Sequence, residues 1–284
     1  MNGIPRDIAI LETRETLSEF VHRPGGRWLA KRLVPTAITP IHVTILSGIF
    51  GFSAGVLFFA GAHNGSLRVA GGIALLLSCI LDCADGELAR QRGRYSLTGM
   101  MLDGLTDNVV GTSVFLGMAY NVVVYTGVPW MWLLGVAAGL SAAAHVWVYD
   151  AKKKQYLNYL GLVHPQEVQP ISALAAQRAQ AAAQGQWFEA FLLSAYIFFR
   201  HTQSVDVTAS TVAADPVGFW QANRGQMRRW TLMGSSLHFF LLYMAAIISP
   251  IWPPAFLACV LLYAVGLNLL FFWLLTHKWD TRAA

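Results

Sequence analysis

Residues Leu81 to Gly111 read LDCADGELARQRGRYSLTGMMLDGLTDNVVG. This stretch carries four aspartates where two long apolar runs approach one another, namely Asp82, Asp85, Asp103 and Asp107. A carboxylate inside the hydrocarbon of a bilayer is costly, so four of them in one place need a compensating partner. Their concentration here indicates a site rather than a lipid-facing surface.

The composition is that of an integral membrane protein. Of 284 residues, 55% are hydrophobic and 12% are charged, and the mean hydropathy is +0.48. Soluble domains usually carry about 25% charged residues. Residues 1–40 are polar and rich in arginine, so we expect no secretory signal peptide. The three cysteines lie in apolar runs and indicate neither a disulfide framework nor a zinc site.

Six apolar runs are long enough to cross about 30 Å of hydrocarbon, which takes roughly 20 helical residues. We predict spans near residues 42–61, 67–87, 99–125, 129–149, 231–250 and 254–276. The expected fold class is an all-α integral membrane protein with six transmembrane helices, an N-terminal interfacial amphipathic helix over residues 5–33 and a cytoplasmic insertion between helices four and five.

The same pattern divides the chain into four parts. We expect a cytoplasmic amphipathic arm at 1–40, helices one to four with the aspartates at 41–150, a cytoplasmic or interfacial insertion at 151–230, and helices five and six with a short cytoplasmic tail at 231–284. Within the insertion, residues 171–185 are expected to be helical. The apolar piece from Trp187 to Arg200 is too short to cross, so we expect it at the membrane surface or packed on the bundle.

Basic residues predict the orientation. Of the twenty Lys and Arg residues, all but Arg68 fall in the N-terminal arm, the 88–98 loop, the 151–230 segment or the C-terminal tail. By the positive-inside rule these regions are cytoplasmic. We therefore expect both termini and the aspartates at the cytoplasmic face, in a prokaryotic inner membrane.

The aspartates are spaced so that each helix presents a pair. Asp82 and Asp85 are three apart and Asp103 and Asp107 are four apart, and residues so spaced share a helix face. The short basic loop between the two helices makes them antiparallel neighbours, so the pairs can face each other. Carboxylates this close stay ionised when a hard divalent cation neutralises them. A Mg²⁺ or Mn²⁺ site at the membrane edge in turn indicates a phosphorylated substrate.

Several other residues each have two possible interpretations. Arg90 can pair with a phosphate or with an aspartate. Arg92 and Arg94 serve either the site or the membrane topology. His145 fits a packed core histidine better than a cavity residue. Gly135 and Gly139 form either a dimer face or a packing contact inside the bundle.

The aspartate stretch resembles the complete signature of the class I CDP-alcohol phosphotransferases, with no departure at its fixed positions. The matching spacing is Asp82-x2-Asp85-Gly86-x2-Ala89-Arg90-x8-Gly99-x3-Asp103-x3-Asp107. The run ITPIHVT, Ile38 to Thr44, is similar to the family's start of the first span, with His42 in place of the usual Asn. The resemblance implies a membrane enzyme of phospholipid biosynthesis that transfers a phosphoryl-alcohol group, by our expectation phosphatidyl, from a CDP-alcohol to a hydroxyl acceptor and releases CMP.

The resemblance also implies roles for individual residues. Asp82, Asp85, Asp103 and Asp107 would hold Mg²⁺ or Mn²⁺, as two ions, and Asp107 would also be the general base. The nucleotide would lie against Asp82, Asp85, Gly86, Ala89, Arg90, Gly99 and Thr44. The implied partners are a CDP-linked alcohol donor, a hydroxyl acceptor, membrane lipids and a second copy in a homodimer, and no nucleic acid.

The identity of the alcohols stays open. Members of the family use CDP-diacylglycerol with a polar acceptor, or a CDP-linked small alcohol of the choline, ethanolamine or inositol type with a lipid or inositol-phosphate acceptor. A phosphorylated acceptor favours basic residues at the cytoplasmic mouth, where the candidates are Lys152, Lys153, Arg224, Arg228 and His145. The Lys and Arg clusters also fit topology signals that touch anionic headgroups.

Two other classes of protein fit less well. An intramembrane prenyltransferase also uses Asp-rich helices and Mg²⁺, but its second such motif lies far along the chain, and from the fifth span onward this sequence has the single acid Asp280. A cation transporter would carry polar residues at mid-depth in several spans. The last two spans offer few, mainly His238 and Asn268.

Overall fold

The computed structural model describes residues 6–93, 96–162, 170–202 and 212–280, and these ranges contain helices and no β-strand. Six helical segments are long and apolar enough to cross a membrane, which confirms the predicted all-α fold and its number of spans. They are Pro40–His63, Gly65–Gln91, Leu97–Thr126, Met131–Tyr159, Pro216–Ile248 and Ala255–Thr276.

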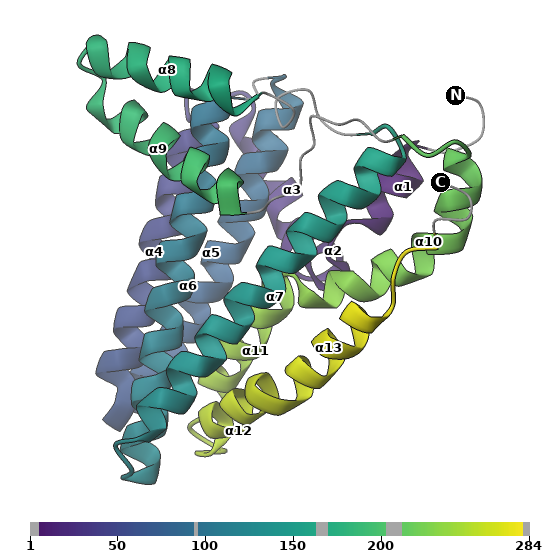
Figure 1. Cartoon of the computed structure of the whole chain (residues 1–284). Helices are drawn as coiled ribbons and strands as arrows, with labels where there is room; N and C mark the ends of the chain where they lie inside the picture. The colour runs from purple at the N-terminus through teal and green to yellow at the C-terminus, as the bar shows by residue number, and fades with distance from the viewer. Residues whose placement is uncertain (1–5, 94–95, 163–169, 203–211, 281–284) are drawn as a thin grey trace.

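The first three spans form an antiparallel group that carries the aspartates (Figure 1). Helix α4 (Pro40–Ala60) packs along both α5 (Gly65–Gln91) and α6 (Leu97–Thr126). The packing is close because a Cβ atom at Gly55 of α4 would lie 2.5 Å from the Oγ of Ser113 on α6. Any larger residue at position 55 would push the two helices apart.

Side-chain caps set where these helices begin. The Oγ1 of Thr39 accepts a hydrogen bond from the backbone N–H of His42, and the Nδ1 of His42 accepts one from the N–H of Thr39 at 3.2 Å. This reciprocal pair is a capping box, so the histidine that replaces the usual Asn has a structural use at the start of α4. Ser96 caps α6 in the same way by accepting from the N–H of Gly99 at 3.0 Å.

The last three spans pack on this group through aromatic side chains. They are α7 (Met131–Tyr159), α11 (Ser235–Ile248) and a final span made of α12 (Ala255–Leu261), the π-helical turn η4 (Leu262–Leu267) and α13 (Asn268–Thr276). The ring of Tyr263 lies 5.2 Å from that of Phe115, and the ring of Phe256 lies 5.4 Å from that of Phe58, both edge-on. These buried rings form the core between the two groups of helices.

The Gly135 and Gly139 pair packs inside the bundle. A Cβ atom at Gly135 would lie 2.4 Å from the Cβ of Ala119, and one at Gly139 would lie 3.1 Å from the Cβ of Phe115. Both neighbours belong to α6, so the two glycines allow α7 to approach α6 closely. A homodimer stays a prediction, and this pair no longer motivates it.

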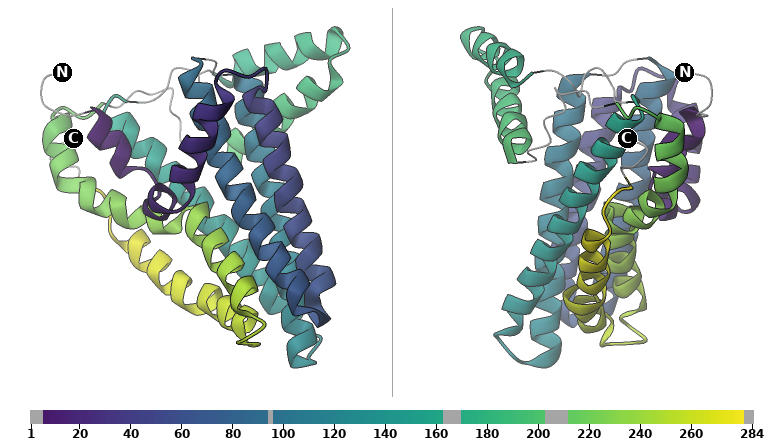
Figure 2. Two further views of the ribbon diagram at one scale, coloured as in Figure 1. Left: turned by 180° about the vertical axis from the view of Figure 1, so that it is seen from behind. Right: turned by 45° about the vertical axis from the view of Figure 1, so that its right-hand side comes forward.

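Where one predicted amphipathic helix was expected over residues 5–33, the chain forms three helices. These are α1 (Arg6–Glu12), α2 (Thr16–Phe20) and α3 (His22–Leu33). Helix α3 packs directly on α5, because a Cβ atom at Gly26 would lie 2.7 Å from the Cβ of Cys83. The arm thus covers one side of the bundle at the end where both termini lie (Figure 2).

Four polar contacts fix the arm to three of the spans. They are Tyr149 Oη to the carbonyl of Thr13 at 2.7 Å, Trp220 Nε1 to Glu12 Oε2 at 2.8 Å, the Ser236 N–H to Glu15 Oε2 at 2.5 Å, and Ser18 Oγ with Cys83 Sγ at 3.4 Å. Hydrogen bonds to buried partners are costly to break without replacement. The arm is therefore built into the structure that surrounds the aspartates.

The boundaries between 149 and 231 differ from the sequence prediction. Helix α7 continues past residue 149 and ends at Tyr159. Gly161, two residues further on, adopts a left-handed φ of 67° and terminates the helix. Helix α10 (Pro216–Trp230) precedes α11 and joins it through the 3-10 turn Thr231–Met233, where the chain changes direction (Figure 1). Polar helices escape a hydropathy search, since such a search detects apolar length alone.

A helical hairpin lies at the same end as the termini. Helices α8 (Ile171–Ala183) and α9 (Trp187–Thr202) pack on each other and project to the side of the bundle (Figure 2). Leu174 and Leu192 are buried in a small core with Met101 of α6. The two helices match the predicted helical stretch and short apolar piece, and they hold the start of α6.

Arg92 has a structural role at the end of α3. Its guanidinium donates hydrogen bonds of 2.6 to 3.1 Å to four carbonyl oxygens, those of Leu33, Val34, Thr36 and Ile38. These carbonyls belong to the end of α3 and the turn into α4, where helical partners are missing. Arg92, the C-cap of α5, therefore joins α5 to the arm. These contacts favour a structural role for Arg92 over a role in the site or in membrane topology.

We expect Arg92→Ala to lower the free energy of unfolding by about 1–3 kcal/mol, because four carbonyls lose a charged donor at once. Arg92→Lys should recover a minor part of the lost stability, since an ammonium group cannot match the planar set of donors that a guanidinium presents. Thermal unfolding of the purified protein in detergent measures both. Arg32→Ala is the matched control, since Arg32 stacks on Trp28 at 5.4 Å within α3 itself. Equal loss in both variants would contradict the proposed clamp.

Candidate active site

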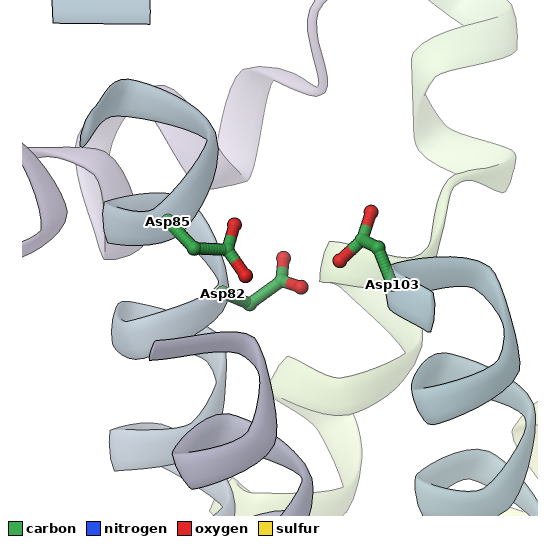
Figure 3. A group of neighbouring side chains, drawn as sticks. All are labelled: Asp82, Asp85 and Asp103. Atoms are coloured by element: carbon green, nitrogen blue, oxygen red, sulfur yellow. The ribbon is translucent and has the colours of Figure 1, made fainter. Parts of the chain in front are cut away.

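Three of the four predicted aspartates meet in the structure. Asp82 and Asp85 of α5 and Asp103 of α6 point their carboxylates toward one another across the gap between the helices (Figure 3). One ligand oxygen from each lies within 4.8 Å of the others. Oxygens on opposite sides of a bound Mg²⁺ or Ca²⁺ ion are about 4–5 Å apart, so a single ion can contact all three.

The trio lacks a cation supplied by the described part of the chain. Its members take part in none of the ion pairs there, and Arg90 pairs with Glu87 at 2.8 Å instead of with an aspartate. Hard oxygen donors without a basic partner suit a divalent cation. The residues present therefore fit Mg²⁺ or Mn²⁺, which is the cation that the sequence predicted.

Thr44 of α4 orients one member of the trio. Its hydroxyl lies 2.5 Å from Oδ2 of Asp85, to which it donates, and 3.2 Å from the carbonyl of Pro40. Both residues are buried. Partners of this kind hold a ligand carboxylate in one orientation and tune its affinity for a metal. The structure thus places Thr44 behind the carboxylates, whereas the sequence predicted it beside the nucleotide.

A polar cavity of about 250 Å³ opens in front of the trio. One wall carries the four aspartates together with Gly86 and Arg90. Other parts of the lining come from the arm, from α7 and from the start of α11, and the charged residues there are Arg14, Glu15, Arg23 and Lys153. The cavity lining therefore combines a group of aspartates with several basic residues.

A second, apolar cavity of about 690 Å³ lies between α6 and α7. Phe115, Leu116 and Leu140 line it, and Asp103 and Asp107 line it as well as the polar cavity. Leu116 and Leu140 are also exposed on the outer surface of the bundle, so this cavity lies beside the apolar exterior. The two cavities meet at these two aspartates.

The glycines around the site are not needed for packing. A Cβ atom at Gly104 would meet nothing within 4 Å, and one at Gly86 would find the Arg90 guanidinium at 3.7 Å, an ordinary contact. Gly104 lines the apolar cavity and Gly86 lines the polar one. Space kept free by glycine beside a cavity leaves room for a ligand to approach the backbone.

The remaining predicted nucleotide contacts lie at the edge of the site. Arg90 lines the polar cavity, while Ala89 is half-buried on α5 and is not in its lining. Gly99 lies in the first turn of α6, where its N–H meets the cap at Ser96. The structure thus brings Gly86 and Arg90 to the cavity and leaves Ala89 and Gly99 beside it.

Of the five candidate acceptor residues, Lys153 lines the polar cavity. Lys152 lies over the ring of Trp279 at 5.9 Å, Arg224 lies over that of Trp220 at 5.2 Å, and Arg228 is exposed on α10. His145 is fully buried, and its Nε2 lies 3.1 Å from Oδ1 of Asn268. This environment matches the packed core histidine that was the favoured interpretation.

Sequence reasoning missed the residues that the arm contributes. Arg14, Glu15 and Arg23 all line the polar cavity, although the sequence placed them on an interfacial helix. Glu19 binds both arginines, with its Oε1 3.1 Å from Arg14 and 3.1 Å from Arg23, and its Oε2 2.5 Å from Arg27. A possible signal was three arginines within reach of one glutamate along 14 residues of chain.

The ionisation of two arm carboxyls follows from these contacts. Burial disfavours the charged form of Glu19, but Arg23, Arg27 and Arg14 outweigh it and hold the pKa of Glu19 below its usual value. Burial raises the pKa of Glu15 above its usual 4.5, and hydrogen bonds from Ser236 offset part of that rise. The surroundings thus favour the ionised form of Glu19 and disfavour the ionised form of Glu15.

Comparison with known proteins points to one family. The model for the CDP-alcohol phosphatidyltransferase family matches residues 34–214. An archaetidylinositol phosphate synthase of Pyrococcus horikoshii is 31% identical over 107 residues, which are 38% of this chain and 54% of the relative. A phosphatidylinositol phosphate synthase of Mycobacteroides abscessus is 31% identical over 110 residues, 39% of this chain and 46% of the relative.

A third relative is similar over the same length of chain. A bifunctional IPC transferase and DIPP synthase of Aquifex aeolicus is 32% identical over 106 residues, 36% of this chain and 23% of the relative. The chain thus spans about half the length of the first two relatives and less of the third. The arm before residue 34 lies outside the family match.

We expect Thr44→Val to weaken Mn²⁺ binding about 10- to 100-fold, because Asp85 loses the donor that orients it. Thr44→Ser keeps the hydroxyl and should bind Mn²⁺ like the unchanged protein. The electron paramagnetic resonance signal of free Mn²⁺ during a titration measures both affinities. Undiminished binding by Thr44→Val would show that this hydroxyl does not support a metal site.

We expect Glu15→Gln to stabilise the protein increasingly as pH rises above 4.5, the usual pKa of the glutamate. Folding raises the pKa of Glu15, so this residue ionises near pH 4.5 in the unfolded chain and at a higher pH in the folded protein. The free energy of unfolding therefore falls as pH rises from 4.5 through the pKa of the folded state. Glutamine does not titrate and keeps an oxygen for the Ser236 N–H. Glu15→Ala removes that acceptor and should cost about 1 kcal/mol. Unfolding midpoints across this pH range test both, and a difference independent of pH would refute the assignment.

Proposed function

Because the chain belongs to the CDP-alcohol phosphatidyltransferase family, we propose that it transfers a phosphatidyl-type group from a CDP-linked lipid to the hydroxyl of a polar acceptor, with release of CMP. The observation that carries this proposal is that Asp103 and Asp107 line both the polar and the apolar cavity. A substrate with an apolar tail and a charged head can occupy both spaces at once. Its reacting phosphate then lies at the aspartates.

We propose that Asp82, Asp85 and Asp103 hold the divalent metal, with Asp107 close by. A divalent cation at this place supplies charge neutralisation for the diphosphate of the donor. Gly86 and Arg90 lie beside the trio on the polar cavity, where they suit the nucleotide end of the donor. Arg90 is exposed enough to exchange its partner Glu87 for a phosphate.

Asp107 suits the role of general base. It lies one turn from Asp103 on the same face of α6, and it is not part of the close trio. Its side chain is exposed where the two cavities meet. A carboxylate within hydrogen-bond reach of the acceptor hydroxyl takes its proton as the new ester bond forms, which a weak nucleophile requires.

The charge distribution supports a cytoplasmic site. The termini, the arm and the connection between α5 and α6 lie at one end of the bundle (Figure 1), and all basic residues but Arg68 belong to segments that we place at that end. We propose that this end faces the cytoplasm, by the positive-inside rule. CDP-activated substrates are then accessible from the aqueous side. The proposed setting is a prokaryotic inner membrane, and the proposed assembly is a homodimer.

A second arrangement uses the same cavities. A CDP-linked small alcohol could react with a lipid acceptor that occupies the apolar cavity, with the aspartates in the same roles. The names of two relatives include inositol phosphate, so an inositol-type compound is the first polar acceptor to test in the first arrangement. Purified protein given separate CDP-alcohols distinguishes the arrangements by which of them releases CMP.

We expect Asp107→Asn to lower turnover about 10²- to 10⁴-fold, because the acceptor hydroxyl loses its base. CMP binding should change little, since the metal trio is intact. Asp85→Asn is the contrasting variant and should weaken CMP binding in the presence of Mg²⁺ as well as turnover. CMP release from CDP-diacylglycerol and calorimetric titration with CMP give the two readouts. Wild-type turnover in Asp107→Asn would end the base assignment.

A further inference from the structure

We propose that Arg14 and Arg23 of the arm, with Lys153 of α7, form a subsite for a phosphomonoester group on the acceptor alcohol. This inference rests on the proposed function and names the class of its acceptor, a phosphorylated polyol. All three residues line the polar cavity, which the four aspartates line as well. The two arginines precede the family match at residue 34, so they are a feature of this chain's own arm.

The arginine cluster carries more positive charge than its counter-ion removes. Glu19 is the shared partner of Arg14, Arg23 and Arg27, at 3.1, 3.1 and 2.5 Å. One carboxylate among three guanidinium groups leaves an excess of two positive charges. Such an excess next to a cavity attracts an anion, and a guanidinium fork matches the geometry of phosphate oxygens.

Arg23 has an unused donor. Its Nε lies 3.1 Å from Oε1 of Glu19, but the N–H does not point at that oxygen, and the buried nitrogen has no hydrogen-bond partner. A buried N–H of a charged group without an acceptor is costly. The side chain itself retains 22% of its exposure, and that exposed part borders the cavity. An anionic oxygen in the cavity is the type of partner that Arg23 lacks.

The arm holds these arginines in place before any ligand arrives. Thr13 accepts a hydrogen bond from Tyr149 of α7 at 2.7 Å, and Glu15 accepts one from the Ser236 N–H of α11 at 2.5 Å. These contacts flank Arg14 on both sides in the sequence. A positioned basic group costs less ordering on binding than a mobile one, so the subsite is preorganised.

Glu15 does not neutralise the three basic residues. It lines the cavity, but its oxygens accept hydrogen bonds from the Ser235 hydroxyl and the Ser236 N–H at the start of α11. The aspartates repel a phosphomonoester unless metal ions intervene. The phosphate of an acceptor is therefore best held by the three basic residues, while the rest of the acceptor extends to Asp107, which lines the same cavity.

The first test compares acceptors with and without the phosphate. Initial rates of CMP release from CDP-diacylglycerol are measured with inositol phosphate against free inositol, and with glycerol phosphate against glycerol. We expect a phosphorylated acceptor to react with a KM at least about tenfold lower than the free polyol. Arg14→Gln and Arg23→Gln should each raise that KM about tenfold or more, with kcat and the KM for the donor little changed.

Arg27→Gln is the matched control. Arg27 binds the same Glu19 but is not in the lining of the cavity, and 43% of its side chain is exposed. It should leave the KM for both acceptors within about twofold, whereas Arg23→Lys should restore part of the loss in Arg23→Gln by returning the charge. Equal KM values for phosphorylated and free polyols, or the same loss in Arg27→Gln as in Arg14→Gln, would overturn the proposal.

A binding measurement separates this inference from the proposed function. Calorimetric titration of the purified protein with inorganic phosphate, without divalent metal, needs no turnover. Binding that persists in Arg27→Gln and weakens about tenfold in Arg14→Gln and Arg23→Gln supports the subsite even if no CDP-alcohol reacts. Absence of phosphate binding, or binding that is equal in all variants, rejects the subsite even if CMP is released. Unfolding midpoints verify that each variant is folded.

Discussion

The arrangement of helices around the site is governed by mutual repulsion among three clustered carboxylates. Asp82, Asp85 and Asp103 bring their oxygens within 4.8 Å of one another, and the described basic residues form no ion pair with them. Such a group is stable where a divalent cation binds it and where rigid helices prevent its members from moving apart. The close packing of α4, α5 and α6, with Thr44 behind Asp85, meets the second condition.

Three environments meet at this point, and each suits one part of a transfer reaction. The aspartates suit a metal and a diphosphate, the apolar cavity suits a lipid chain, and the basic residues of the polar cavity suit an anion on the acceptor. Asp107 lines both cavities, and a carboxylate there can take the proton that must leave a hydroxyl. This arrangement explains why the arm, α5, α7 and α11 all contribute residues to the cavities that Asp103 and Asp107 line.

The difference between sequence and structure is clearest in the arm. An alternation of apolar and charged residues over 5–33 predicts a surface helix, and that pattern alone cannot distinguish water from the wall of a polar cavity. In the structure Arg14 and Arg23 gather around Glu19 because the chain bends between α1, α2 and α3 and packs against α5. Likewise α7 and α10 extend beyond the predicted boundaries, since polar helical turns leave no signal in hydropathy.

By itself the sequence determined the number of spans and the pairing of aspartates. Apolar length has to match the thickness of hydrocarbon, and residues three or four apart have to share a helix face. Only the tertiary structure decided what lies opposite them. It separated Asp107 from the close trio, packed His145 into the core, buried Gly135 against Ala119 and brought Lys153 and the arm to the cavity. The hydrogen bonds between the arm and α11 join residues 221 positions apart, and no local pattern encodes which distant helices will meet.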